Sequence, residues 1–99
     1  MASVWIRAAE MRVRISEHVV VRELGGEAVL LHLGTGIYFG LDTVGARIWQ
    51  LLAGQGDTEA VYAQLLGEYE VDAVRLRADL DALVEQLIAE QLLFPADSP

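Results

Sequence analysis

The stretch VLLHLGTGIYFGLDTVGARIWQLL, residues 29–52, contains the most informative signals for the fold of this chain. Its first part is aliphatic, as expected of a strand, and Gly34-Thr35-Gly36 then turns the chain. Ile37 to Leu41 is predicted as the next strand. Asp42 or Thr43 is the expected N-cap of a helix, because either side chain can accept a hydrogen bond from an unpaired helical N–H. The stretch therefore predicts strand, turn, strand and helix in direct succession.

The residues before this stretch predict more antiparallel structure. Val19 to Leu24 and Glu27 to Leu33 are aliphatic or β-branched runs on either side of Gly25-Gly26, and two glycines permit the positive φ angles of a tight hairpin. Apolar and polar residues alternate from Met11 to Ser16, which is the period of a short strand with one buried face. We therefore expect a three-stranded antiparallel meander that ends in Ile37 to Leu41, with an extra N-terminal strand.

The residues after the stretch predict two further helices. Asp57-Thr58 can cap the second helix, and Asp72 begins the third, which reaches roughly Glu90. Pro95 is expected to end regular structure. Strands followed by helices indicate an α+β fold, with three α-helices against one face of the sheet. The expected parts of the chain are an N-terminal extension or extra strand (1–16), one domain (17–94) and a tail (95–99).

The composition excludes several kinds of site. The chain has no cysteine, which rules out disulfides and thiolate metal ligands. Its two histidines, His18 and His32, are predicted as surface residues of strands, so no metal ion or cofactor is expected. No apolar run approaches the ~20 residues that span a bilayer, and the first residues lack the layout of a secretory signal. A cytoplasmic location, with no membrane partner, is the default expectation.

No arrangement of side chains predicts catalysis. Asp79 and Asp81 are two apart on a helix and point to different sides, so they cannot act as a paired acid and base. Ser16 lies in no nucleophile turn. Gly34-Thr35-Gly36 lacks the lysine of a phosphate-binding loop, so a turn is the better interpretation. We therefore expect that the chain is not an enzyme.

A nucleic-acid reader is the main alternative from a different class. The second and third predicted helices resemble a helix-turn-helix pair, in which the third helix would read the DNA. The net charge is −8, however, and only Arg75 and Arg77 oppose the acids between Asp57 and Gln91. Attraction to phosphates grows with the number of basic groups. No nucleic-acid partner is therefore expected, although a winged-helix DNA-binding regulator stays open as the alternative.

Peptide recognition fits the pattern better. In a meander of order one-two-three, the third strand lies at an edge and exposes unpaired N–H and C=O groups that an extended peptide can satisfy. Apolar pockets between this strand and the third helix would select side chains, and charged residues on that helix could pair with charges on the peptide. The predicted peptide-binding residues are Gly36, Ile37, Tyr38, Phe39, Gly40, Leu41, Arg75, Leu76, Arg77, Asp79, Leu80, Leu83 and Val84.

The joint pattern resembles a known family. AVLLHLGTGIYFGLDTVGARIWQLL, then EYEVD, and then LRADLDALVEQLIAEQLL are similar to the PqqD-like proteins, which are the precursor recognition elements of pathways for ribosomally made, post-translationally modified peptides. The variant GxYFGLDxxGARIW looks most like the stand-alone recognition proteins of lasso-peptide clusters. The resemblance covers about residues 17 to 94, so residues 1 to 16 lie largely outside it.

The resemblance implies a winged-helix-like domain of three strands and three helices that performs no chemistry. Such domains bind the leader part of a precursor peptide as an added strand, beside the third strand and against the third helix. They deliver it to a leader peptidase or another modifying enzyme. If the strand at Met11 to Ser16 covered the third strand rather than the opposite edge, the site would be blocked or would serve a homodimer. A subunit that only stabilises its enzyme partner is a further alternative.

Overall fold

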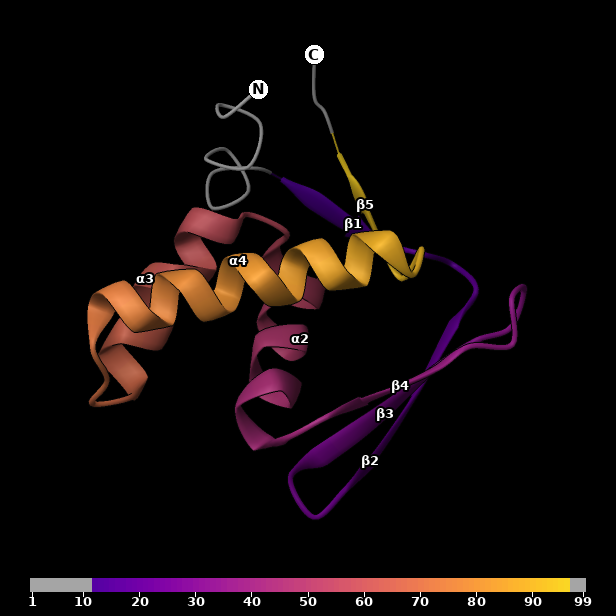
Figure 1. Cartoon of the computed structure of the whole chain (residues 1–99), viewed down its shortest axis with the longest axis horizontal. Helices are drawn as coiled ribbons and strands as arrows, with labels where there is room; N and C mark the ends of the chain where they lie inside the picture. The colour runs from indigo at the N-terminus through magenta and orange to yellow at the C-terminus, as the bar shows by residue number, and fades with distance from the viewer. Residues whose placement is uncertain (1–11, 97–99) are drawn as a thin grey trace.

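The computed structural model describes residues 12–96, so residues 1–11 of the predicted extension and residues 97–99 of the tail lie outside it. Figure 1 shows the helices on one side of a small sheet, which confirms the predicted α+β class. None of the described helices is long and apolar enough to cross a membrane. In chain order the helices and strands are β1 (Val13–Ile15), β2 (Val19–Leu24), β3 (Glu27–His32), β4 (Tyr38–Leu41), α2 (Thr43–Gln55), α3 (Thr58–Glu68), α4 (Ala73–Ala89) and β5 (Leu93–Pro95).

The predicted meander is confirmed, because β2, β3 and β4 form an antiparallel sheet in that order. Gly25 and Gly26 join the first two strands with φ angles of 62° and 87°. This left-handed backbone is what a two-residue hairpin needs, and glycine adopts it without steric strain. β4 is paired by β3 on one side only, so its other side is a free edge within the described part of the chain.

The N-terminal strand lies elsewhere than predicted. The sequence predicts it on the edge of the meander opposite the third strand, but β1 pairs with β5, with Val13 opposite Pro95. The chain reverses after α4 at Gln91, which has a φ of 64°, and this turn brings β5 back beside β1. Leu93 is fully buried there. Pro95 is the last residue of β5, so regular structure ends there within residues 12–96, as predicted, but it ends in a strand. β1 leaves the free edge of β4 open.

One apolar core lies between the meander and the helices. Leu30 from β3, Ile48 and Trp49 from α2, and Leu80 and Val84 from α4 are each exposed by 4% or less. α2 contacts both β3 and α3, and α3 contacts α4. In Figure 1, α2 extends from the end of β4 toward α3 and α4. α4 therefore lies opposite β4.

The helix starts follow the predicted caps. Asp42, Asp57 and Asp72 each precede a helix and accept a hydrogen bond from a backbone N–H in its first turn. These contacts satisfy amides that have no partner within the helix. They confirm the predicted starts of the second and third helices, and they select Asp42 over Thr43 as the cap of the first.

His32 is not a surface residue, and the prediction for it is wrong. Its side chain is 5% exposed, and its Nδ1 accepts hydrogen bonds from the backbone amides of Gly34 at 3.0 Å and Thr35 at 3.1 Å. The residue falls on the inner face of β3, where it shapes the turn that leads into β4. Within residues 12–96 no group of three or more potential metal ligands is present.

Candidate functional site

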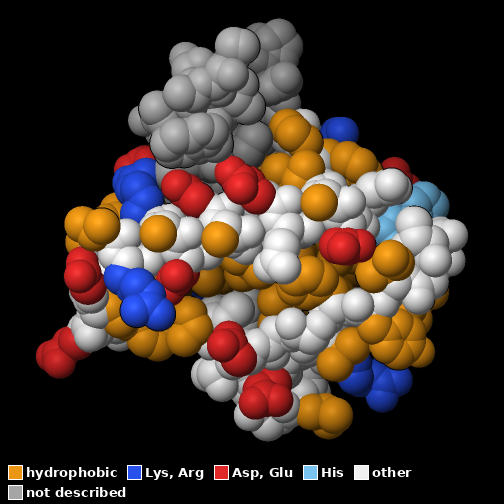
Figure 2. Space-filling model, in the orientation of Figure 1, with side chains coloured by type: hydrophobic (Ala, Val, Ile, Leu, Met, Phe, Trp, Pro, Cys, Tyr) orange, Lys and Arg blue, Asp and Glu red, His pale blue; other side chains and the backbone are white. Residues whose placement is uncertain are grey.

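A groove with a volume of about 860 Å³ lies between β4 and α4. We call it the β4–α4 groove. Figure 2 shows it as a hollow beneath α4 with hydrophobic side chains on its floor. The residues that line it come from β4, the first half of α2, the segment before α4, and α4 itself. They are Phe39, Gly40, Leu41, Asp42, Val44, Gly45, Ile48, Val71, Asp72, Arg75, Leu76, Asp79, Leu83 and Gln86.

The floor of the groove is apolar because three elements turn core residues toward it. Leu41, Ile48 and Leu76 are each buried, and Phe39 is half-buried beside them. α2 packs this closely because residue 45 is a glycine, at which a Cβ would lie 3.2 Å from the Cδ2 of Leu41. An apolar side chain that enters the groove can therefore be removed from water against this floor.

About half of the backbone N–H and C=O groups of β4 point to its outer edge, where no described strand pairs with them. The amide of His32 donates to the carbonyl oxygen of Ile37 at 2.9 Å. Because bonded pairs alternate along an antiparallel ladder, Phe39 directs both its N–H and its C=O toward β3, and Ile37 directs its C=O there. The N–H of Ile37 instead donates to the Oγ1 of Thr35 at 3.3 Å. Tyr38 and Gly40 direct theirs toward the free edge. The edge therefore offers two N–H and two C=O groups to an extended chain.

Most of the sequence-predicted site residues meet at this groove. Ile37 and Tyr38 flank it at the start of β4, and both are exposed. Gly36 lies in the preceding turn, where its φ of 78° is the left-handed conformation. The predicted residues that line the groove itself are Phe39, Gly40, Leu41, Arg75, Leu76, Asp79 and Leu83.

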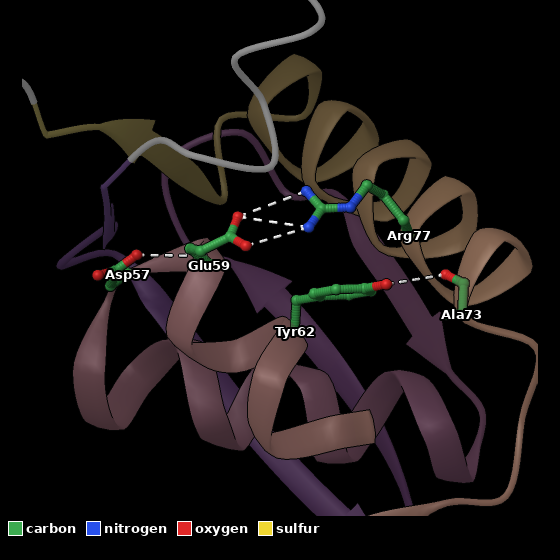
Figure 3. Close-up of polar contacts among 5 residues, drawn as sticks. All are labelled: Asp57, Glu59, Tyr62, Ala73 and Arg77. Atoms are coloured by element: carbon green, nitrogen blue, oxygen red, sulfur yellow. Dashed lines mark hydrogen bonds and ion pairs between the residues drawn. The ribbon is translucent and has the colours of Figure 1, made fainter. Parts of the chain in front are cut away.

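Three predicted residues lie elsewhere. Leu80 and Val84 are completely buried in the core. Arg77 lies on the side of α4 that faces α3, where it pairs with Glu59 at 3.1 Å and stacks over the ring of Tyr62 (Figure 3). Apolar and charged residues occur on several faces of α4, so their spacing alone does not separate the groove from the core. We leave these three residues out of the groove.

α2 supplies groove residues that the sequence did not single out. Val44, Gly45 and Ile48 all line the groove. Ile48 is buried, whereas Val44, one helical turn before it, is 41% exposed. Gly45 is the one sequence signal that could have indicated that α2 lines the groove. A glycine in the first turn of a helix costs stability relative to alanine, so it usually has a packing or functional reason.

The charges at the groove lie on its rim. Asp42 and Asp72 cap α2 and α4, and Arg75 and Asp79 form an ion pair within α4 at 3.4 Å. The two side chains of that pair are 77% and 62% exposed, so the pair contributes little to stability. The site thus combines a free strand edge, an apolar floor and a charged rim.

Comparison with known proteins identifies the family. A family model described as "Coenzyme PQQ synthesis protein D (PqqD)" matches residues 27–93. The chain belongs to the PqqD family. The matched segment runs from β3 to the first residue of β5, so both walls of the β4–α4 groove lie within the family domain. The resemblance found in the sequence is therefore confirmed.

Two solved structures resemble this PqqD-family chain over most of its length. One is described as "TbiB1 in Complex with the TbiA(beta) Leader Peptide"; it has a TM-score of 0.76 and 42% identity, over 81% of this chain and 93% of that chain. Another, "Lasso peptide synthetase B1 complexed with the leader peptide", has a TM-score of 0.75 and 28% identity, over 85% of this chain and 99% of that chain. Among curated proteins, the comparison gives no match.

Proposed function

We propose that this PqqD-family protein binds the leader region of a ribosomally synthesised precursor peptide as an added strand on β4. The observation that carries the proposal is the free backbone of Tyr38 and Gly40 beside an apolar groove. A free strand edge next to a pocket is the arrangement in which β-strand addition gives affinity and side chains give specificity. Both solved relatives are described in complex with a leader peptide, which supports the class of ligand.

The pleat of the sheet fixes which leader side chains would enter the groove. Phe39 and Leu41 lie on the inner face of β4, whereas Tyr38 and Gly40 lie on the outer face. Residues opposite one another in a sheet share a face. The leader residues opposite Phe39 and Leu41 would therefore point into the groove, two positions apart. We expect both of them to be apolar.

The energetics require such side chains. The four backbone groups on the free edge of β4 can form four hydrogen bonds, which contribute about 4 kcal/mol in total at a net ~1 kcal/mol each. A micromolar Kd corresponds to about 8 kcal/mol. Each fully buried apolar side chain adds roughly 1.5 to 3 kcal/mol. Two buried anchors bring the gross gain to about 7 to 10 kcal/mol, and association itself costs several kcal/mol. Backbone pairing alone therefore cannot give micromolar binding, and buried leader side chains must supply the rest.

A delivery protein also needs a surface for the enzyme that receives the peptide. The face of the β2–β3–β4 sheet that is turned away from the helices is uncovered in the described structure (Figure 1). Val20, Leu31 and Tyr38 lie side by side across it, and the first and last are 45% and 71% exposed. Exposed apolar patches of this kind mark interaction sites. We assign this face to the leader peptidase or other modifying enzyme, because a leader added to β4 would extend the same sheet.

The proposed role requires no chemistry from this chain. Ser16, the one serine near a histidine in sequence, is 5% exposed, and its Oγ accepts from the backbone N–H of His18 at 3.1 Å. The hydroxyl thus closes a turn instead of facing a base. We therefore infer a non-catalytic role in which the partner enzyme supplies the reaction.

The proposal is tested by titrating the purified protein with the fluorescently labelled leader of the precursor encoded beside it. Tyr38→Pro removes an amide on the free edge, at the first residue of an edge strand, where the fold tolerates proline. Tyr38→Ala is the matched control, because it removes the ring but keeps the amide. We expect Tyr38→Pro to bind about fivefold more weakly than Tyr38→Ala. Equal affinities would contradict strand addition, and no binding by the wild type would contradict the function.

Two sequence-based alternatives are separated by simple experiments. A DNA regulator would retard duplex DNA at low salt, whereas we expect no retardation, since α4 carries Asp79, Asp81 and Glu85 beside two ion-paired arginines. The homodimer stays a prediction. A second copy on β4 would compete with the leader, so the molar mass in solution would fall when leader is added.

A further inference from the structure

The charged side chains of the β4–α4 groove are unevenly distributed along it. They are Asp42 directly after β4, Asp72 directly before α4, and Arg75 and Asp79 in the first half of α4. The second half of α4 lines the groove with uncharged side chains, among them Leu83. The groove therefore has two chemically different ends.

The topology brings the acids together. β4 and α4 run in opposite directions on the two sides of the groove in Figure 1, so the end of β4 lies at the same end of the groove as the start of α4. Figure 2 shows acidic side chains on both sides of the hollow there. We call this region, formed by Asp42, Asp72 and Asp79, the acidic end.

The arginines of the described helices do not neutralise the acidic end. Arg47 and Arg77 each pair with a glutamate that does not line the groove. Arg75 pairs with Asp79 at 3.4 Å. Asp42 and Asp72 belong to none of the ion pairs among the residues that the structure describes. Two carboxylates therefore remain without a cationic partner there.

Helix capping reduces this negative charge without removing it. One oxygen of Asp42 accepts from the amide of Gly45 at 2.8 Å, and one oxygen of Asp72 accepts from the amide of Val74 at 2.9 Å. Each helix N-terminus offsets roughly half a charge. Three carboxylates, one guanidinium and two helix ends then leave about one negative charge. Both capping residues line the groove, so a ligand that enters this end meets their carboxylates.

We propose that the acidic end makes the groove selective for leaders that carry a lysine or arginine just beyond the residue that pairs with Gly40. This inference rests on the proposed function, because it assigns the ligand's charge at the same site. A cation placed there is attracted by both capping carboxylates, whereas an anion is repelled by them. The apolar floor selects the side chains of the leader residues that pair with β4, and the acidic end selects the charge of the leader residue that flanks them.

The test uses anisotropy titrations with labelled synthetic leaders of the precursor encoded beside this chain. The residue flanking the pairing strand is lysine, glutamine or glutamate, varied at each end of the strand in turn. Asp42→Asn and Asp72→Asn remove charge but keep the cap, because asparagine caps helices as well as aspartate does. Asp57→Asn is the matched control, since Asp57 caps α3 and does not line the groove. Thermal melts check that each variant is folded.

At one end of the strand we expect the lysine leader to bind about three- to tenfold more tightly than the glutamate leader, with glutamine between them. The preference should shrink in Asp42→Asn and in Asp72→Asn, persist in Asp57→Asn, and fade at 0.5 M salt. Equal affinities at both ends, a preference for glutamate, or a lysine preference that both groove variants retain would overturn the inference while the proposed function stands. No binding of any leader would overturn both.

Discussion

The guanidinium carbon of Arg77 lies 4.0 Å from the centroid of the Tyr62 ring (Figure 3). Glu59 holds the same guanidinium at 3.1 Å, and the Tyr62 hydroxyl donates to the carbonyl oxygen of Ala73 at 3.1 Å. These contacts join α3 to the start of α4 on a side of α4 that does not line the groove. Arg77 therefore fastens the helices together and is not available to the ligand.

The Arg77→Ala variant separates this structural role from a role in binding. Arg77→Ala should lower the free energy of unfolding by about 1 kcal/mol, through loss of the cation–π contact and a partly exposed ion pair. Its affinity for the leader should stay within about twofold of the wild type. Arg75→Ala is the control for stability, because its ion pair is solvated. Urea unfolding measures the free energy of unfolding, and leader titration measures the affinity. A large loss of affinity in folded Arg77→Ala would show that Arg77 contacts the leader.

Asp81 should be a destabilising residue at neutral pH. Its Oδ1 is buried and has no hydrogen-bond partner among the described residues, and burial raises the pKa of its carboxyl group. An acid whose pKa is raised by folding opposes folding when ionised, so stability increases as the pH falls through that pKa. Asp81→Ala should therefore stabilise the protein at pH 7, by on the order of 1 kcal/mol.

Asp79→Ala is the matched control for Asp81→Ala, since it gains the same helix propensity on the same helix but starts from an exposed carboxylate. Asp79→Ala should raise the free energy of unfolding by less than Asp81→Ala does. A protein destabilised by Asp81→Ala would show that this carboxylate has a favourable partner after all.

Gly56 should tolerate no side chain, whereas Gly54 should. Gly56 ends α2 with a φ of 70°, and a Cβ there would lie 2.7 Å from the carbonyl oxygen of Val13. Gly56→Ala should cost about 2 kcal/mol or more, through backbone strain and displacement of β1. A Cβ at Gly54 meets nothing within 4 Å, so Gly54→Ala should gain about 0.5 to 1 kcal/mol from helix propensity. Denaturant titrations check both, and equal effects would contradict the placement of β1.

Part of the acid sensitivity should come from Glu68. Hydrogen bonds from Arg47, and then from Gln64, lower the pKa of the Glu68 carboxyl group from 4.5 to about 2. Because the folded pKa is depressed, the stabilisation is present above about pH 4.5 and is lost as the pH falls toward 2. Glu68→Gln should therefore lower the melting temperature at pH 7, and the difference from the wild type should shrink between those two pH values.

Glu70→Gln is the control for this pH series, because Glu70 takes no part in the ion pairs of residues 12–96. The melting temperature of Glu70→Gln should equal that of the wild type at every pH of the series. A Glu68→Gln difference that is constant from pH 7 to pH 2 would show that the pairing with Arg47 does not depend on ionised Glu68.

Much of the fold can be predicted from the sequence because its signals are local. The Gly25-Gly26 hairpin and the caps at Asp57 and Asp72 each depend on a few neighbouring residues, and all three occur as predicted. The pairing of β1 with β5 is not local. It joins three-residue strands from opposite ends of the chain, and only the reversal at Gln91 brings them together.

The site is harder to predict because it depends on how α4 is rotated about its axis. Leu76, Leu80 and Leu83 are alike in sequence, yet Leu80 is fully buried in the core while the other two line the groove. Arg77 and Asp79 are two apart and point to different sides. The spacing identifies the helix as amphipathic, but only the packing of α2 and α3 against it determines which residues face β4.

Pairing of the leader with the free edge of β4 can be measured residue by residue as amide hydrogen exchange in the leader-bound protein. The amides of Tyr38 and Gly40 face this edge, whereas that of Phe39 is already bonded to β3. Saturating leader should slow exchange at Tyr38 and Gly40 by tenfold or more relative to the free protein, with a much smaller change at Phe39. Unchanged exchange at Tyr38 and Gly40 under saturating leader would show that the leader does not pair with β4.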